Sequence, residues 1–120
     1  MSNGYDQEAM DARANELCEI CGIRVATEWN HCLVNKDKRF PILNRIYNLQ
    51  HVCHPCHTDT GHTRKNRSAF WWSQFCKYED EFLEWWDEVL DTLVRNLGYE
   101  GLRMAADEYA EERLGADGLT

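Results

Sequence analysis

The sequence predicts an α+β fold, in which a small core held together by cysteines is followed by C-terminal helices. Three observations carry this prediction. Two CxxC pairs stand on either side of residues 22–52. Short segments rich in β-branched and aromatic residues lie between the pairs, as is typical of strands. After residue 68, apolar residues recur at the three-to-four spacing of an amphipathic helix.

The length of 120 residues allows one domain, or one domain with an appendage. We expect a polar N-terminal arm over 1–16, the cysteine-bound core over 17–78 and an acidic helical extension over 79–120. No apolar run approaches the ~20 residues that a membrane-spanning helix needs, and residues 1–19 lack the apolar centre of a signal peptide. The sequence therefore predicts a soluble, intracellular (cytoplasmic) protein with no membrane contact.

Four cysteines have the spacing of zinc ligands: Cys18, Cys21, Cys53 and Cys56. Four thiolates close a tetrahedral Zn²⁺ site. Two disulfides are disfavoured in an intracellular chain, and a redox dithiol needs only one such pair in a strand-to-helix context. We therefore predict a structural zinc site, and we expect Cys32 and Cys76 to be buried small side chains.

The predicted helices and strands around the two CxxC pairs, which we call the zinc knuckles, are short. Residues 8–17 have a weakly helical composition. Residues 25–34 have the β-branched and aromatic content of a strand, and 47–53 is predicted to be a second, short strand. The connection 35–46 is too long for a tight hairpin, so we expect a basic loop that folds back over the strand pair. Residues 58–65 are expected to form turns.

The C-terminal part is predicted to be helical. From 68 to about 97, apolar residues recur at helical spacing and acids fill the opposite face. Asn66 or Ser68 is the expected N-cap, and residues 78–81 are expected to bend the segment into two helices. A shorter acidic helix is predicted over 102–114. The tryptophans of this part are expected to form helix core or an oligomer contact rather than a platform for bases.

The net charge of -8 hides a partition along the chain. Residues 1–30 hold two bases and six acids, residues 31–67 hold seven bases and two acids, and residues 68–120 hold four bases and thirteen acids. All five histidines lie in the basic middle part. Charge blocks often mark solvated faces, but the histidines favour an anion-binding centre within an acidic frame.

Histidine and asparagine residues surround the knuckles in a particular order. Asn30 and His31 close the first predicted strand, Asn48 stands in the second, and His57 directly follows the second CxxC pair. This order of His, Asn and His, framed by zinc knuckles, resembles the HNH endonuclease family and its ββα-metal fold. The resemblance covers about residues 17–78 and implies metal-dependent hydrolysis of phosphodiester bonds in DNA.

The resemblance assigns a role to individual residues. It implies that His31 is the general base, that Asn48 steadies the loop and orients this base, and that His57 binds a catalytic Mg²⁺ or Mn²⁺. A neutral histidine can take a proton from water near pH 7, and a divalent cation stabilises the charge that develops on the phosphate. The zinc of the knuckles is separate and structural.

Two positions depart from the family's pattern. Asn30 stands where Asp or His commonly supplies a metal ligand, and Gly61 stands where a further His or Asn is frequent. We expect the amide oxygen of Asn30 to bind the cation and His62 to substitute for the residue missing at 61. His51 and His54 lie outside the matched positions and are expected to be structural or surface groups.

Basic residues flank the predicted site. They are expected to contact phosphates and to position DNA without reading its sequence: Lys36, Lys38, Arg39, Arg64, Lys65 and Arg67. Short stand-alone HNH proteins are frequent in phage genomes, so the resemblance implies a phage-encoded protein that acts in a bacterial host.

A second hypothesis belongs to a different class of protein. A catalytically degenerate ββα-zinc module would bind nucleic acid or a protein partner, with its acidic, aromatic C-terminal helices as the protein-contact surface. A third hypothesis, a redox dithiol protein, is disfavoured because the chain has two CxxC pairs. Metal-dependent cleavage of DNA separates the first two hypotheses.

Overall fold

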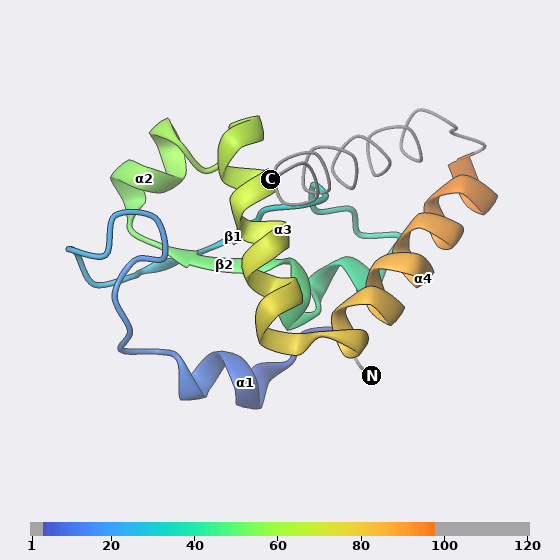
Figure 1. The fold of residues 1–120 in the computed structure, drawn as a ribbon, viewed down its shortest axis with the longest axis horizontal. Coiled ribbons are helices and arrows are strands. Elements are labelled where there is room, and N and C mark those ends of the chain that lie inside the picture. The colour runs from blue at the N-terminus through green and yellow to red at the C-terminus, as the bar shows by residue number, and fades with distance from the viewer. Residues whose placement is uncertain (1–3, 98–120) are drawn as a thin grey trace, which may run out of the picture. The chain divides into compact units, whose positions relative to one another are not determined.

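The computed structural model describes residues 4–97 (Figure 1). The described chain divides into two compact units, with the division between Trp71 and Trp72. The elements in chain order are α1 (Gln7–Ala12), β1 (Glu28–His31), η1 (Pro41–Asn44), η2 (Ile46–Asn48), β2 (Leu49–Val52), α2 (His54–Asp59), α3 (Arg64–Tyr78) and α4 (Asp80–Leu97). Helices and one small sheet thus share the chain, which confirms the α+β class. No helix among the described residues is long and apolar enough to cross a membrane.

The sheet is an antiparallel pair in which Trp29 of β1 stands opposite His51 of β2. Both strands are shorter than the predicted 25–34 and 47–53. The first strand begins later because Ala26 donates its backbone N–H to Glu16 rather than to a neighbouring strand. The backbone N–H of Cys32 still bonds to the Asn48 backbone oxygen at 2.9 Å, but those of Leu33 and Val34 bond to a side chain described below, so the strand ends at 31. The ends of both strands are therefore set by contacts distant in the sequence.

The connection between the strands contains the short 3₁₀ helices η1 and η2, not only an open loop. Its apolar residues Leu43 and Ile46 are buried, whereas its lysines are exposed. The N-terminal arm docks here: Asp6 accepts a hydrogen bond of 2.7 Å from the Ile46 backbone and pairs with Arg45 at 2.9 Å. This arm belongs to the same compact unit as the sheet.

Helix α2 occupies part of the segment that we expected to form turns, and α3 begins at Arg64, before the expected position. The Thr63 hydroxyl accepts a hydrogen bond of 3.2 Å from the Asn66 backbone N–H, so Thr63 caps α3 and neither Asn66 nor Ser68 does. Asn66 and Ser68 are buried instead. The sequence-based cap was therefore wrong, because the Thr63 hydroxyl supplies the capping oxygen three residues before Asn66 and five before Ser68.

The predicted bend between the two C-terminal helices is confirmed. Glu79 has a φ of 51° and separates α3 from α4. On α4 one face is buried by residues at helical spacing, namely Phe82, Trp85, Trp86, Val89 and Leu93. Cys76 of α3 is exposed, contrary to expectation, because it faces away from the buried side chains of its helix. The helix predicted over 102–114 lies outside the described residues.

Candidate functional site

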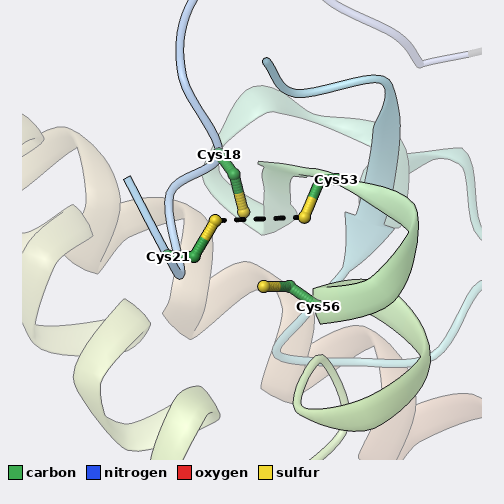
Figure 2. A group of neighbouring side chains, drawn as sticks. All are labelled: Cys18, Cys21, Cys53 and Cys56. Atoms are coloured by element: carbon green, nitrogen blue, oxygen red, sulfur yellow. Dashed lines mark hydrogen bonds between the residues drawn. The ribbon is translucent and has the colours of Figure 1, made fainter. Parts of the chain in front are cut away.

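The four paired cysteines converge on one point (Figure 2). Cys18 and Cys21 come from the segment before β1, and Cys53 and Cys56 come from the junction of β2 and α2. Their Sγ atoms all lie within 4.8 Å of one another, and those of Cys21 and Cys53 are 4.0 Å apart. Tetrahedral Zn²⁺ with Zn–S bonds of about 2.3 Å places its sulfurs about 3.8 Å apart. This donor set fits zinc.

The surroundings of Cys21 and Cys56 shift the pKa values of these two thiols in opposite directions. Backbone N–H groups of Arg24 and Ile23 lower the pKa of Cys21 to about 6. Burial, and then the neighbouring thiols, raise the pKa of Cys56 to about 12. A bound cation relieves this conflict because it stabilises all the thiolates at once.

Arg24 lies beside the cysteine group, although the sequence pattern did not single it out. A hydrogen bond to Cys53, followed by the charges of the cysteines, raises the pKa of the Arg24 guanidinium. Four thiolates around one Zn²⁺ carry a net negative charge, which a nearby guanidinium partly neutralises. Cys32 is buried, and this burial raises its pKa to about 12, which leaves a thiol of low reactivity.

His31, the predicted general base, stands at the end of β1 and is partly buried. Its Nε2 lies 2.9 Å from the amide oxygen of Asn44. An amide oxygen only accepts hydrogen bonds, so Nε2 carries the proton and Nδ1 of the neutral ring keeps a lone pair. Burial lowers the pKa of His31, and the charges of Lys36 and His57 add to this effect while the bond to Asn44 opposes it. The neutral form therefore predominates at pH 7.

Asn48 is fully buried and ties together the segment that follows His31. Its Oδ1 accepts hydrogen bonds from the backbone N–H groups of Leu33 at 2.9 Å and Val34 at 3.1 Å. Its Nδ2 donates to the carbonyl oxygens of Val34 at 2.9 Å and Leu43 at 2.8 Å. This side chain replaces a strand partner, ends β1 and fixes the backbone directly after His31.

Two neighbours of His31 were missed by sequence reasoning. Asn44 holds the ring directly, and Tyr5 approaches it edge-on with ring centroids 6.2 Å apart. The preceding residue Gly4, at a φ of +85°, lies close against Pro41: a Cβ on Gly4 would lie 2.0 Å from the Pro41 oxygen. Neither contact has a sequence signal, since both depend on how the connection between the strands folds.

Asn30 is fully buried, and it holds the turn after α2. Its Nδ2 donates to the Gly61 oxygen at 2.9 Å and lies 3.3 Å from Oε1 of Gln50. Gln50 and Asn66 pair through their amides at 3.0 and 2.9 Å, and Asn66 also donates to Gly61 at 3.1 Å. Within the described part of the chain, Oδ1 of Asn30 is buried without a hydrogen-bond partner.

The remaining predicted ligands, His57 and His62, line an open pocket of about 330 Å³ on β1 and α2 and just beyond α2, with Glu28, His54 and Thr58. Oε1 of Glu28 lies 2.6 Å from Nδ1 of His57, and Oε2 lies 2.8 Å from Nδ1 of His54. The bonds to His57 and His54 lower the pKa of the Glu28 carboxyl. Among residues 4–97, only the four cysteines form a group of three or more potential ligands with all ligand atoms within 4.8 Å.

The predicted phosphate contacts are exposed, except for the partly buried Arg67: Lys36, Lys38, Arg39, Arg64, Lys65 and Arg67. Arg39 is paired with Asp37 at 2.7 Å, and Arg67 donates to the backbone oxygen of His62. Lys36 lies near enough to His31 to affect its pKa. His51 is buried and stacks on Trp29 with ring centroids 3.9 Å apart, which is a structural role.

Fold and site together define a small α+β unit with a four-cysteine group that could hold a metal ion. Comparison with family models, with curated proteins and with solved structures finds no match.

Proposed function

We propose that this chain is a metal-dependent HNH-type endonuclease that hydrolyses phosphodiester bonds in DNA. The observation that carries the proposal is the state of His31. Its Nε2 is engaged by Asn44 at 2.9 Å and its pKa is lowered, mainly by burial. A ring in this state offers Nδ1 to a proton, which is what a general base for an attacking water requires.

The other residues of the unit have separate tasks in this proposal. Asn48 fixes the backbone after His31, and Asn44 orients the ring of the base. Lys36 places a positive charge near His31, where it attracts a phosphate. The exposed bases of the loop and of α3 add attraction for the DNA backbone that weakens as salt concentration rises.

The resemblance also implies a catalytic cation, Mg²⁺ or Mn²⁺, at Asn30, His57 and His62. The donor types suit such a group: Oδ1 of Asn30 is a buried amide oxygen without a partner among the described residues, and His57 and His62 line one pocket, of which Asn30 is not a lining residue. When bound, a divalent cation stabilises the charge on the phosphate and on the leaving oxygen. The residues of the chain supply the general base, hold its ring in orientation and bind the DNA backbone.

Plasmid nicking tests the proposal. Zinc-loaded protein is incubated with supercoiled plasmid in EDTA, Mg²⁺, Mn²⁺ or Ni²⁺, together with His31→Ala and with the exposed control Asp11→Asn. We expect nicking that depends on the added cation, falls about 10²–10⁴-fold in His31→Ala and is unchanged in the control. Metal-dependent nicking that survives in His31→Ala would exclude His31 as the base.

A second candidate function is favoured by the surface of α4. Its acids are exposed while its tryptophans Trp85 and Trp86 are buried. A pocket on this helix is lined by Asp87, Glu88, Leu90, Asp91 and Val94. Such a face suits a basic protein partner, as a catalytically degenerate zinc module would need. Absence of nicking with every cation, together with retained binding of DNA or of a basic protein, favours this second function.

A further inference from the structure

Glu28 joins two histidines in a way that the HNH-like motif does not predict. Its two carboxylate oxygens lie 2.6 Å from Nδ1 of His57 and 2.8 Å from Nδ1 of His54. A carboxylate accepts hydrogen bonds, so each Nδ1 carries the proton that it donates. In the neutral ring, the lone pair then belongs to Nε2. One carboxylate thereby fixes the tautomer of both imidazoles.

The geometry of the pocket suits a cation held by imidazoles. His54, His57 and His62 line the same pocket, and the ring centroids of His57 and His62 are 5.6 Å apart. Two imidazoles on one ion, with metal–nitrogen bonds of about 2.1 Å, place their centroids about 5 Å apart. The side chain of His54 is 73 % exposed, so it has room to turn toward an ion bound by the other two.

Glu28 also supplies the negative charge that position 30 lacks. Alternate residues of a strand share a face, so Glu28 and Asn30 of β1 lie on the same face. Nδ2 of Asn30 donates to the Gly61 oxygen at 2.9 Å, and its side chain is neutral. The carboxylate near the histidines is thus two residues earlier than the motif places it.

We propose that Glu28 is the positioning residue of a histidine-lined cation site, with His54 as a ligand beside His57 and His62. A carboxylate that accepts the Nδ1–H of a metal-bound histidine orients the ring and strengthens the ligand. Imidazole ligands suit Ni²⁺ and Zn²⁺, whereas Mg²⁺ prefers oxygen ligands. The site therefore binds Ni²⁺ more tightly than Mg²⁺. This inference rests on the proposed function only for the use of the cation in cleavage.

Calorimetric titration of the zinc-loaded full chain with Ni²⁺ and with Mg²⁺ measures the site. Zinc content and thermal unfolding are recorded for each variant, so that loss of the fold is recognised. We expect Ni²⁺ to bind in addition to the zinc, and Glu28→Ala to weaken this binding about 10–100-fold. His54→Ala, a change at an exposed side chain, is expected to weaken it as well. The control Asp59→Asn, on the same helix but outside the pocket, is expected to leave the Ni²⁺ affinity unchanged.

Nitrogen NMR of the histidine rings separates positioning from a purely structural role. In the wild type, long-range proton–nitrogen correlations are expected to show protonated Nδ1 and unprotonated Nε2 for His54 and His57. Glu28→Gln keeps one acceptor oxygen and gains a donor amide, so one of the two rings is expected to change its tautomer. The folded Glu28→Gln protein with both tautomers unchanged would overturn the positioning role.

Different results would reject the proposed cation site and the proposed nuclease activity. Ni²⁺ affinity that is equal in wild type, Glu28→Ala and His54→Ala overturns the site, whether or not plasmid is nicked. Ni²⁺ binding that is lost in these variants, with no nicking under any condition, supports the site and rejects the nuclease.

Discussion

The four-cysteine group and the histidine pocket both use residues of α2, yet they are built differently. The sulfurs already lie within 4.8 Å of one another, and no further ligand is needed to complete a tetrahedron. The imidazoles instead line an open pocket, and those of His54 and His57 hydrogen-bond to Glu28. A closed set of ligands is typical of structural metal sites, and an open one is typical of sites that exchange ligands. From this difference we propose that the thiols contribute stability and that the histidines contribute chemistry.

The largest expected effect comes from breaking the closed site. Cys56→Ser removes one thiolate, and structural Zn²⁺ contributes on the order of 10 kcal/mol to folding. We expect this variant to lose its zinc and the cooperative thermal transition of residues 1–71. Elemental analysis and calorimetry measure both quantities. Cys76→Ser changes an exposed thiol of α3 and serves as the control that should behave like wild type.

If Cys56→Ser retained native thermal stability, the closed site would not be structural. A wild-type sample with native stability, no zinc and disulfides in place of the four thiols would equally contradict a structural zinc site.

A smaller effect is expected at the support of the predicted base. Asn48→Ala removes four hydrogen bonds to the backbone of residues 33, 34 and 43, and it leaves these groups buried. We expect the free energy of unfolding to fall by about 2–4 kcal/mol, as measured by urea denaturation. The exposed neighbour Asn35→Ala is the matched control and should change stability little. Equal stability of both variants would mean that Asn48 does not hold this segment.

The smallest expected effect concerns the orientation of His31. Asn44→Ala removes the acceptor of the Nε2 proton, a loss of about 1 kcal/mol that corresponds to roughly fivefold in cleavage rate. Asn44→Asp keeps an acceptor oxygen and is expected to retain more of the rate. Plasmid nicking under matched metal conditions compares the two variants. Identical rates for Asn44→Ala and wild type would remove Asn44 from the site.

The sequence predicted features that depend on neighbours in the chain. The CxxC spacing placed all four cysteines together, and the helical periodicity of residues 68–97, with a bend within 78–81, was correct. The strand ends were not predictable, because the Asn48 side chain and the backbone of Glu16 decide where β1 stops and starts. Local sequence patterns thus predicted the two strands and the two long helices, but not α2 or the 3₁₀ helices, and distant contacts determined where the strands begin and end.

The candidate site was predictable only in part, for the same reason. The motif named His31, Asn48 and His57, which occupy one compact unit. Glu28 and Asn44 reach the histidines across the fold, so they have no spacing that marks them. A long-range contact leaves no pattern in a single sequence, and these two residues had to come from the structure.

The most direct test of the division into a structural zinc site and a histidine-lined cation site measures zinc content and plasmid nicking on the same sample. The zinc-loaded protein is assayed with Ni²⁺, then after brief treatment with EDTA, and again after Ni²⁺ is restored. We expect EDTA to abolish nicking and added Ni²⁺ to restore it, while one zinc per chain is retained throughout. Nicking that persists in EDTA, or zinc that leaves together with the activity, would contradict this division.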